Sequence, residues 1–237
     1  MIPLIIALIT FSDYPLHKLL YSLVVSILAM IACIILIPRL KHYTEKADIF
    51  GIDLNKPGEK SSKPRIPEAA GIITSIVFLI ACTQIEAKLE YSSGLLAITF
   101  MILLGFVDDT VDLRWKYKLI LPLVTSVPLI TSYQGVTHIV LPIPFRPIFG
   151  KTLELGILYK VYMSMIAIFC SNSINIHAGI NGLEVGQSIV IASAIMIHNI
   201  LEINLGLSEH IVQNHVFSLT IILPFLFTSL ALFKFNK

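Results

Sequence analysis

The fold class is decided by Lys18–Pro38, KLLYSLVVSILAMIACIILIP, an apolar run whose only charged residue is its first. A helix needs about 20 mostly apolar residues to cross the hydrocarbon core of a bilayer. Six further apolar stretches follow, so we predict an all-α polytopic membrane protein with about seven transmembrane helices. The expected spans are roughly 18–38, 69–85, 93–107, 119–133, 153–171, 185–203 and 215–233.

The composition agrees with this class. Of 237 residues, 56% are hydrophobic and 14% are charged, whereas a soluble domain carries about 25% charged residues. The net charge of +2 gives no basic field, so we expect no nucleic-acid partner. Three cysteines without a spacing pattern indicate neither a disulfide framework nor a zinc site. We expect one integral-membrane domain over residues 1–237. Its apolar start has no basic n-region, which argues against a cleaved signal peptide.

The distribution of Lys and Arg predicts the orientation. The odd-numbered connections and the C-terminal tail hold twelve of these residues, and the opposite side holds four. Because positive charge is enriched on the cytoplasmic side, we expect the odd-numbered loops in the cytosol and the N-terminus in the lumen. The polar motifs described next all fall on the twelve-charge side.

An acidic cluster, Asp108-Asp109-Thr110-Val111-Asp112, stands where the third apolar stretch ends. On a helix, Asp112 would share a face with both Asp108 and Asp109. Clustered carboxylates repel unless a cation or a shared proton compensates, and Mg²⁺ with a diphosphate is one natural solution. The alternative is a solvated helix end. Three cations in the same loop favour a metal–phosphate site: Arg114, Lys116 and Lys118.

A second polar motif is Asn172–Glu184, NSINIHAGINGLE. Asn172 and Asn175 are one helical turn apart, and glycines bracket Asn181, so the chain is expected to bend there. Asparagine side chains can ligate Mg²⁺ or hydrogen-bond a sugar or base. An ordinary turn is the alternative for an Asn- and Gly-rich segment.

The long first loop carries a third motif, from Asp53-Leu54-Asn55-Lys56 to Lys63–Gly71. Two prolines stiffen the approach to the second span. Glu68 stands at the start of that helix, where exposed N–H groups favour a carboxylate, so helix capping alone is one explanation for it. The basic residues of this loop could instead serve anionic lipid headgroups.

Taken together, these motifs resemble the polyprenyl-phosphate hexosamine-1-phosphate transferase family, and specifically its eukaryotic members that begin N-glycan assembly in the endoplasmic reticulum. The similar segments run in family order over essentially the whole chain. They are Asp53–Lys56, Ile66–Gly71, Leu104–Lys118, Pro144–Gly150, Leu155–Tyr162, Cys170–Gln187 and Asn214–Leu219.

The resemblance implies an enzyme of the endoplasmic reticulum membrane that transfers GlcNAc-1-phosphate from UDP-GlcNAc to dolichyl phosphate with Mg²⁺. Its partners would be these two substrates and the lipid bilayer, and a homodimer is one expected assembly. Asp108 and Asp109 would match the acidic pair that activates the lipid phosphate or organises Mg²⁺, and Lys118 the lysine on the diphosphate. Asn175 would ligate Mg²⁺. The implied substrate-binding residues are Leu54, Glu68, Asp112, Asn172, Asn181 (at the uridine) and Glu184.

The family continues past the position that matches Lys237, with a second metal-binding aspartate and about ten spans in all. We therefore expect this chain to be C-terminally truncated and to lack full activity alone. Two alternatives remain open. One is an inactive or regulatory membrane remnant. The other is a membrane prenyltransferase that uses Asp108–Asp112 as a DDxxD motif, although the chain has no second aspartate-rich motif.

Overall fold

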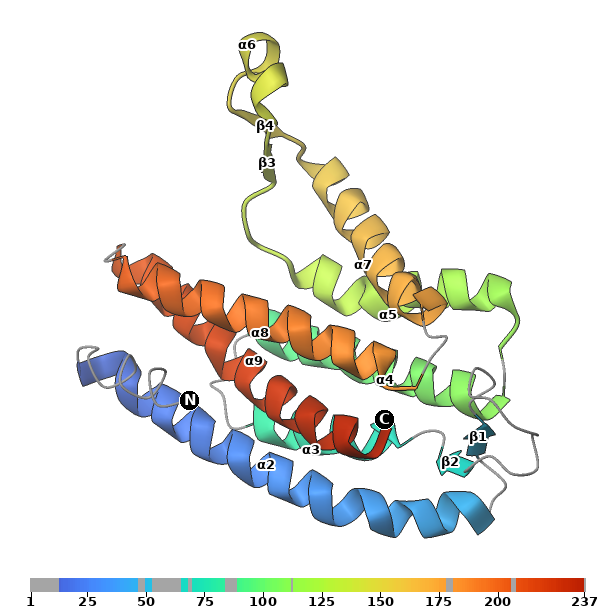
Figure 1. Cartoon of the computed structure of the whole chain (residues 1–237). Helices are drawn as coiled ribbons and strands as arrows, with labels where there is room; N and C mark the ends of the chain where they lie inside the picture. The colour runs from blue at the N-terminus through green and yellow to red at the C-terminus, as the bar shows by residue number, and fades with distance from the viewer. Residues whose placement is uncertain are drawn as a thin grey trace. The chain divides into compact units, whose positions relative to one another are not determined.

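A computed structural model describes residues 13–46, 50–52, 65–67, 70–83, 89–111, 113–177, 181–205 and 208–236 of the chain. Long helices dominate these residues, and the strands form two short antiparallel pairs (Figure 1). The elements are α2 (Asp13–Lys46), β1 (Phe50–Ile52), β2 (Arg65–Pro67), α3 (Gly71–Cys82), α4 (Leu89–Val111), α5 (Trp115–Ser132), β3 (His138–Val140), the 3₁₀ helix η2 (Ile143–Phe145), α6 (Arg146–Phe149), β4 (Thr152–Glu154), α7 (Ile157–His177), α8 (Leu183–Asn204) and α9 (Glu209–Asn236).

A helix lies at each of the seven predicted spans. Five of these helices are long and apolar enough to cross a membrane, namely α2, α4, α7, α8 and α9. The other two differ from the expectation. Helix α3 has 12 residues and extends about 18 Å, which is shorter than the ~30 Å hydrocarbon core. Helix α5 has 18 residues, begins with four basic or aromatic residues and contains Pro122 and Pro128. The chain is an all-α polytopic membrane protein.

The chain divides into two compact units, residues 1–86 with 177–237, and residues 87–176. In the first unit, α9 packs against α2, α3 and α8. Helix α2 presents small residues on the stripe that contains Ser22, Ser26, Ala29 and Cys33, all of them buried. Small side chains let membrane helices approach closely. The Ser22 hydroxyl accordingly donates to the Thr220 carbonyl of α9 over 3.3 Å.

Helices α8 and α9 form an antiparallel pair (orange and red in Figure 1) that holds a polar network in an apolar setting. Asn199 of α8 is 3% exposed, and its Nδ2 donates to Ser218 Oγ over 2.8 Å. Its Oδ1 lies 2.8 Å from His215 Nδ1. A buried amide is costly unless its polar atoms are paired, so this network joins the two helices at a defined register.

In the second unit, α4 and α5 form an antiparallel helix pair. Gly94 of α4 has no side chain, so a Cδ1 atom of Leu129 in α5 comes close to its backbone. Beyond α5, β3 and β4 form an antiparallel hairpin in which His138 is opposite Glu154. The Glu154 carboxylate accepts a hydrogen bond from the Thr137 hydroxyl, and this bond lowers the pKa of Glu154 below its usual value. A short helical segment, η2 with α6, caps this hairpin.

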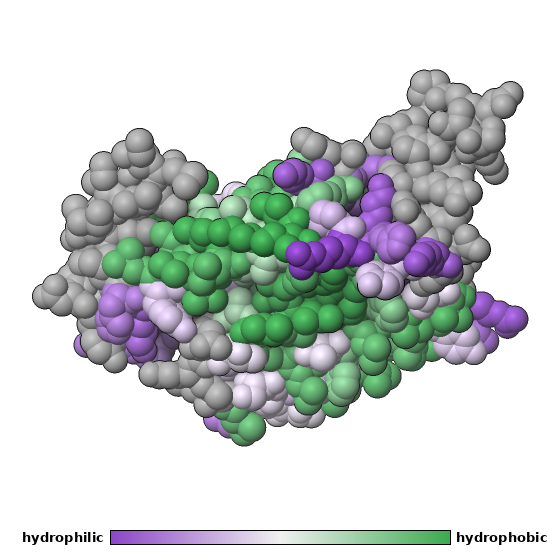
Figure 2. Space-filling view, turned by 90° about the horizontal axis from the view of Figure 1, so that it is seen from below, coloured by the Kyte–Doolittle hydropathy of each residue, from purple (hydrophilic) through white to green (hydrophobic). Residues whose placement is uncertain are grey.

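The outer surfaces of the helices are apolar. Figure 2 shows hydrophobic side chains across the middle of one face, with hydrophilic residues gathered toward its margins. On α2, for example, Val24, Leu28 and Ile35 are each about half exposed. A soluble protein rarely exposes a continuous apolar patch of this kind, whereas lipid-facing helices require one.

Candidate functional site

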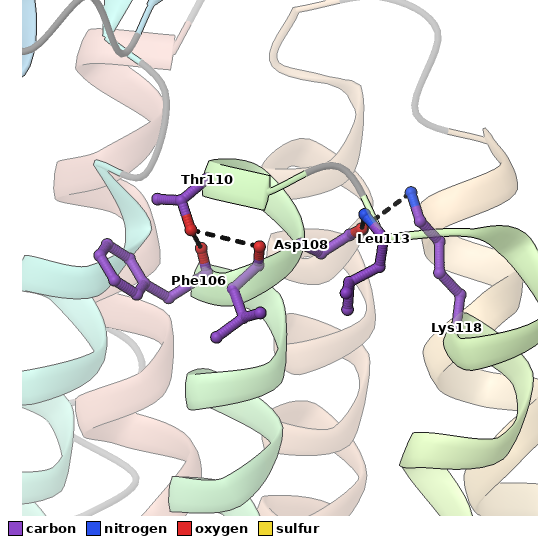
Figure 3. Close-up of polar contacts among 6 residues, drawn as sticks. Phe106, Asp108, Thr110, Leu113 and Lys118 are labelled. Atoms are coloured by element: carbon purple, nitrogen blue, oxygen red, sulfur yellow. Dashed lines mark hydrogen bonds and ion pairs between the residues drawn. The ribbon is translucent and has the colours of Figure 1, made fainter.

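An ion pair forms where α4 turns into α5. Asp108 is in the last turn of α4, Lys118 is in the first turn of α5, and Lys118 Nζ lies 2.8 Å from Asp108 Oδ1 (Figure 3). The same oxygen accepts a hydrogen bond from the Leu113 N–H over 3.2 Å. Both side chains are mostly buried, with 17% of Asp108 and 25% of Lys118 exposed. Both described contacts of Asp108 use Oδ1, so Oδ2 remains available to a ligand.

The position of the carboxylates on α4 disfavours a purely structural role. The C-terminal end of a helix carries partial negative charge, so an acidic residue there is unfavourable by about 0.3–1 kcal/mol. Asp108 and Asp109 both occupy this end. Lys118 offsets the charge of Asp108. Acidic residues kept at an unfavourable helix end, where a membrane helix leaves the bilayer, indicate a functional site.

The side chains around this ion pair differ in whether they are exposed and could contact a ligand. Asp109 is exposed. Thr110 turns its hydroxyl back onto the Phe106 and Val107 carbonyls of its own helix (Figure 3). Lys116 is exposed and places Nζ 5.0 Å from the ring centroid of Tyr117. Exposed carboxylate and ammonium groups therefore stand beside a fixed Asp108–Lys118 pair, an arrangement that suits an anionic ligand together with a cation.

Two predicted asparagines lie at the end of α7. Asn172 donates from Nδ2 to the Ile168 carbonyl of its own helix over 2.9 Å, so that N–H is already used locally. Asn175 follows one turn later in the same helix. The helical path from Asn172 to Asn175 confirms the predicted one-turn spacing. The side chain of Asn175 lies outside the described part of the structure.

The Asn181–Gly182 turn precedes α8. Gly182 has φ of 81°, a left-handed conformation that glycine adopts without strain. Its N–H donates to Asn236 Oδ1 over 2.9 Å. The Asn181 Nδ2 atom is buried and has no hydrogen-bond partner. Such a group costs about 1–3 kcal/mol, and an acceptor on a ligand would satisfy it. Glu184 is exposed in the first turn of α8, where a carboxylate is favourable.

The structure brings only part of the predicted set together. Asp108 and Lys118 are in direct contact within the second unit. Asn181 and Glu184 belong to the first unit. Leu54, Glu68 and Asp112 lie outside the described residues.

Among the described residues, no group of three or more His, Cys, Asp or Glu side chains could hold a metal ion. The donor set still fits Mg²⁺, because that ion commonly binds one or two carboxylates together with substrate phosphates. Asp108 Oδ2 and the exposed carboxylate of Asp109 are oxygen donors of the required kind.

Sequence reasoning missed Asn236. The residue stands at the last position of α9, 54 positions after Gly182, and its side chain accepts the N–H of that glycine. No local pattern signals this contact, because a lone asparagine at a helix end usually serves the helix itself.

Comparisons with known proteins agree with these observations. Residues 91–237 match the model of glycosyl transferase family 4. The chain is 44% identical over 229 residues to a UDP-N-acetylglucosamine–dolichyl-phosphate N-acetylglucosaminephosphotransferase of Dictyostelium discoideum, an alignment that covers 85% of this chain and 56% of the relative. It is 37% identical to the Saccharomyces cerevisiae protein of the same name, over 85% and 53% of the two chains.

More distant similarity reaches bacteria. The chain is 30% identical over 160 residues to a phospho-N-acetylmuramoyl-pentapeptide-transferase of Borreliella burgdorferi, covering 59% of this chain and 44% of the relative. The chain spans about half the length of the curated relatives that it matches.

Proposed function

This chain belongs to glycosyl transferase family 4, and from that premise we propose that it serves the transfer of GlcNAc-1-phosphate from UDP-GlcNAc to dolichyl phosphate. The products are GlcNAc-diphosphodolichol and UMP. Relatives in two organisms that carry the name of this activity support the choice of substrates. The same names favour this reaction over prenyl transfer at a DDxxD motif.

The Asp108–Lys118 pair is the observation that carries the proposal. Lys118 is held at 2.8 Å from Asp108 at the end of an apolar helix. A lipid phosphate lies at the membrane surface, and a nucleotide arrives from water, so the two reactants can meet only at such a helix end. A fixed lysine there neutralises phosphate charge, and a fixed carboxylate beside it orients the attacking group.

The transfer balances without any further reactant. A phosphate oxygen of the lipid attacks the β-phosphorus of UDP-GlcNAc, the bond from that phosphorus to the bridging oxygen breaks, and UMP leaves with the electron pair. Lys118 would stabilise charge on the diphosphate during this step. Asp108 or Asp109 would take a residual proton from the lipid phosphate or hold that phosphate in line. Asn181 Nδ2 would donate to an acceptor on the uridine.

We also propose that this site binds Mg²⁺. Asp108, Asp109 and Asn175 are the residues that would hold it. When bound, the ion would neutralise phosphate charge and lower the barrier to displacement.

We infer that the protein works in the endoplasmic reticulum membrane, with the α4–α5 turn in the cytosol and the N-terminus in the lumen. The excess of Lys and Arg on the side of that turn supports this orientation. Dolichyl phosphate in the relatives' names supports the compartment.

A direct assay tests the proposal. The full-length product of this gene is purified in detergent and incubated with radiolabelled UDP-GlcNAc, dolichyl phosphate and Mg²⁺, and labelled lipid is extracted. We expect labelled GlcNAc-diphosphodolichol from the unaltered protein, and at least a hundredfold less from Asp109→Asn.

Glu90 provides a matched control. It is an exposed carboxylate in the first turn of α4, at the opposite end of the helix from Asp109. Glu90→Gln removes the same charge and should leave product formation within twofold. The absence of lipid product from the unaltered protein, or full activity of Asp109→Asn, would refute the proposed site.

A further inference from the structure

A side chain at the end of α9 holds the turn that precedes α8. Asn236 Oδ1 accepts the N–H of Gly182 over 2.9 Å, and the Gly182 carbonyl accepts the N–H of Gly186 over 2.8 Å. Both polar groups of this buried glycine are therefore paired. Gly182 is left-handed, with φ of 81°, and these two bonds fix the conformation in which it directs the chain into α8.

The end of α9 is a rigid support for this contact. Phe235, next to Asn236, packs against the buried cluster of Cys33, Ile37 and Ala231, which joins α2 to α9. Phe233 lies against Gly186 of α8, where an added Cβ would come within 3.4 Å of its ring. A side chain supported on a packed helix positions its partner more accurately than a loop can.

The group that this support positions is the Asn181 side chain. Asn181 precedes Gly182 directly, and its buried Nδ2 has no partner. Buried polar groups are nearly always hydrogen-bonded, so this amide is set to meet an acceptor that a ligand supplies. Movement of the Gly182 peptide would move that amide with it.

We propose that Asn236 is a positioning residue for nucleotide binding: it holds the Gly182 peptide so that Asn181 Nδ2 meets the uridine of UDP-GlcNAc. This inference rests on the proposed function, because it assigns the Asn181 amide to the nucleotide. Asn236 itself touches no substrate. Its loss is expected to weaken nucleotide binding and to leave the lipid substrate unaffected.

The test compares three variants of the full-length gene product in detergent: Asn236→Ala, Asn236→Asp and Asn204→Ala. The aspartate keeps the accepting oxygen in place. Asn204 is a matched control, since this exposed asparagine near the other end of α8 donates, among the described residues, to the Ile200 carbonyl of its own helix. The measurements are the Kd of labelled UDP-GlcNAc and the KM values for UDP-GlcNAc and dolichyl phosphate.

We expect Asn236→Ala to raise the Kd and KM for UDP-GlcNAc about three- to tenfold, the loss that one hydrogen bond predicts. The KM for dolichyl phosphate should stay within twofold. Asn236→Asp should restore nucleotide affinity, and Asn204→Ala should match the unaltered protein. A merely structural role for Asn236 would lower the yield of folded protein and leave both KM values unchanged.

A second measurement covers the case in which Asn236→Ala does not fold. In the unaltered protein, amide hydrogen exchange at Gly182 should slow when UDP-GlcNAc binds, because the ligand would lock the turn. No change in exchange, or an unchanged Kd in folded Asn236→Ala, would overturn the inference alone. Failure of the unaltered protein to bind UDP-GlcNAc would overturn the proposed function, and this inference with it.

Discussion

Lys118 Nζ lies 2.8 Å from Asp108 Oδ1, and the Leu113 N–H reaches the same oxygen. One carboxylate oxygen therefore ties the last turn of α4 to the first turn of α5. Charge-assisted hydrogen bonds of this kind are about twice as strong as neutral ones. Neither of these contacts uses the second oxygen of Asp108, which is the oxygen that the proposed reaction would use.

Replacing Lys118 should lower the transferase activity far more than replacing a neighbouring lysine that carries the same charge. Lys118→Ala would remove the cation that we propose for the diphosphate and would leave Asp108 without its ion-pair partner. Loss of one such group lowers kcat by about 10²–10³-fold. Lys116→Ala removes the same charge two residues away, where the ammonium lies over Tyr117, and should retain at least half the activity. The assay is transfer from labelled UDP-GlcNAc. Equal losses in both variants would show that only the charge of the loop matters.

Chelation should stop the reaction reversibly. We expect EDTA to abolish lipid product and Mg²⁺ to restore it, because Asp108 and Asp109 provide oxygen donors suited to a hard cation. Asn175→Ala should raise the Mg²⁺ concentration for half-maximal activity several-fold. Asn204→Ala serves as the asparagine control and should not. Full transfer after exhaustive chelation would remove Mg²⁺ from the proposed site.

Gly182→Ala should destabilise the protein. A side chain on a left-handed residue costs about 1–2 kcal/mol, so we expect the thermal unfolding midpoint in detergent to fall by several degrees. Gly94→Ala is the matched control. Gly94 lies within helix α4, and its new methyl group would meet Leu129 Cδ1 at an ordinary 3.7 Å. That variant should match or exceed the parent in stability. If both variants unfold alike, the left-handed conformation of Gly182 is not what the protein requires.

Ser218→Ala should weaken the α8–α9 pair. It leaves the Nδ2 atom of buried Asn199 without its acceptor, and an unpaired buried group costs about 1–3 kcal/mol. Ser188 offers a control on the same helix pair, because the hydrogen bond that its hydroxyl makes within the described structure stays inside its own helix, to the Glu184 carbonyl. Ser188→Ala should be neutral. Unfolding of the two variants in detergent is compared, and equal stability would mean that Asn199 finds another partner.

The β3–β4 hairpin should loosen in acid. The Thr137 hydroxyl lowers the pKa of Glu154, so the stabilisation is present above the usual carboxylate pKa and is lost as pH falls through the lowered one. As the pH falls, we expect faster hydrogen exchange at the Leu155 amide, which donates to the Thr137 carbonyl across the base of the hairpin. In Glu154→Gln this acid-dependent step should be missing. A step that persists in that variant would have another origin.

Hydropathy and charge were sufficient to predict the fold class. The run from Lys18 to Pro38 predicted the membrane helix that the structure shows as part of α2. The acidic cluster and Lys118 were expected in one short loop, and the structure places Asp108 and Lys118 in contact. Such local predictions succeed because residues ten positions apart across a tight helix turn have little freedom to separate.

Longer-range features were not predictable from the sequence. The bond from Gly182 to Asn236 joins residues 54 positions apart, and its existence depends on how α8 and α9 pack. The network around Asn199 has the same origin. The β3–β4 hairpin was missed because its strands have three residues each, too few to show an alternating pattern. Hydropathy also overestimated the length of α3, which ends at Cys82.

The polar network of Asn199 has a consequence for residues far from it. Helices α8 and α9 are joined at Asn199 and Ser218 near their connection and again at Gly182 and Asn236 at their open end. Residues 182–199 and 218–236 number 18 and 19 and span nearly equal lengths, about 26 Å. The two helices are thus hydrogen-bonded to each other at both ends. A shift of one helix by one turn along the other would break both hydrogen bonds together. The Gly182–Asn236 bond that holds the turn beside Asn181 therefore depends on the helix register that the Asn199–Ser218 bond sets at the other end of the pair.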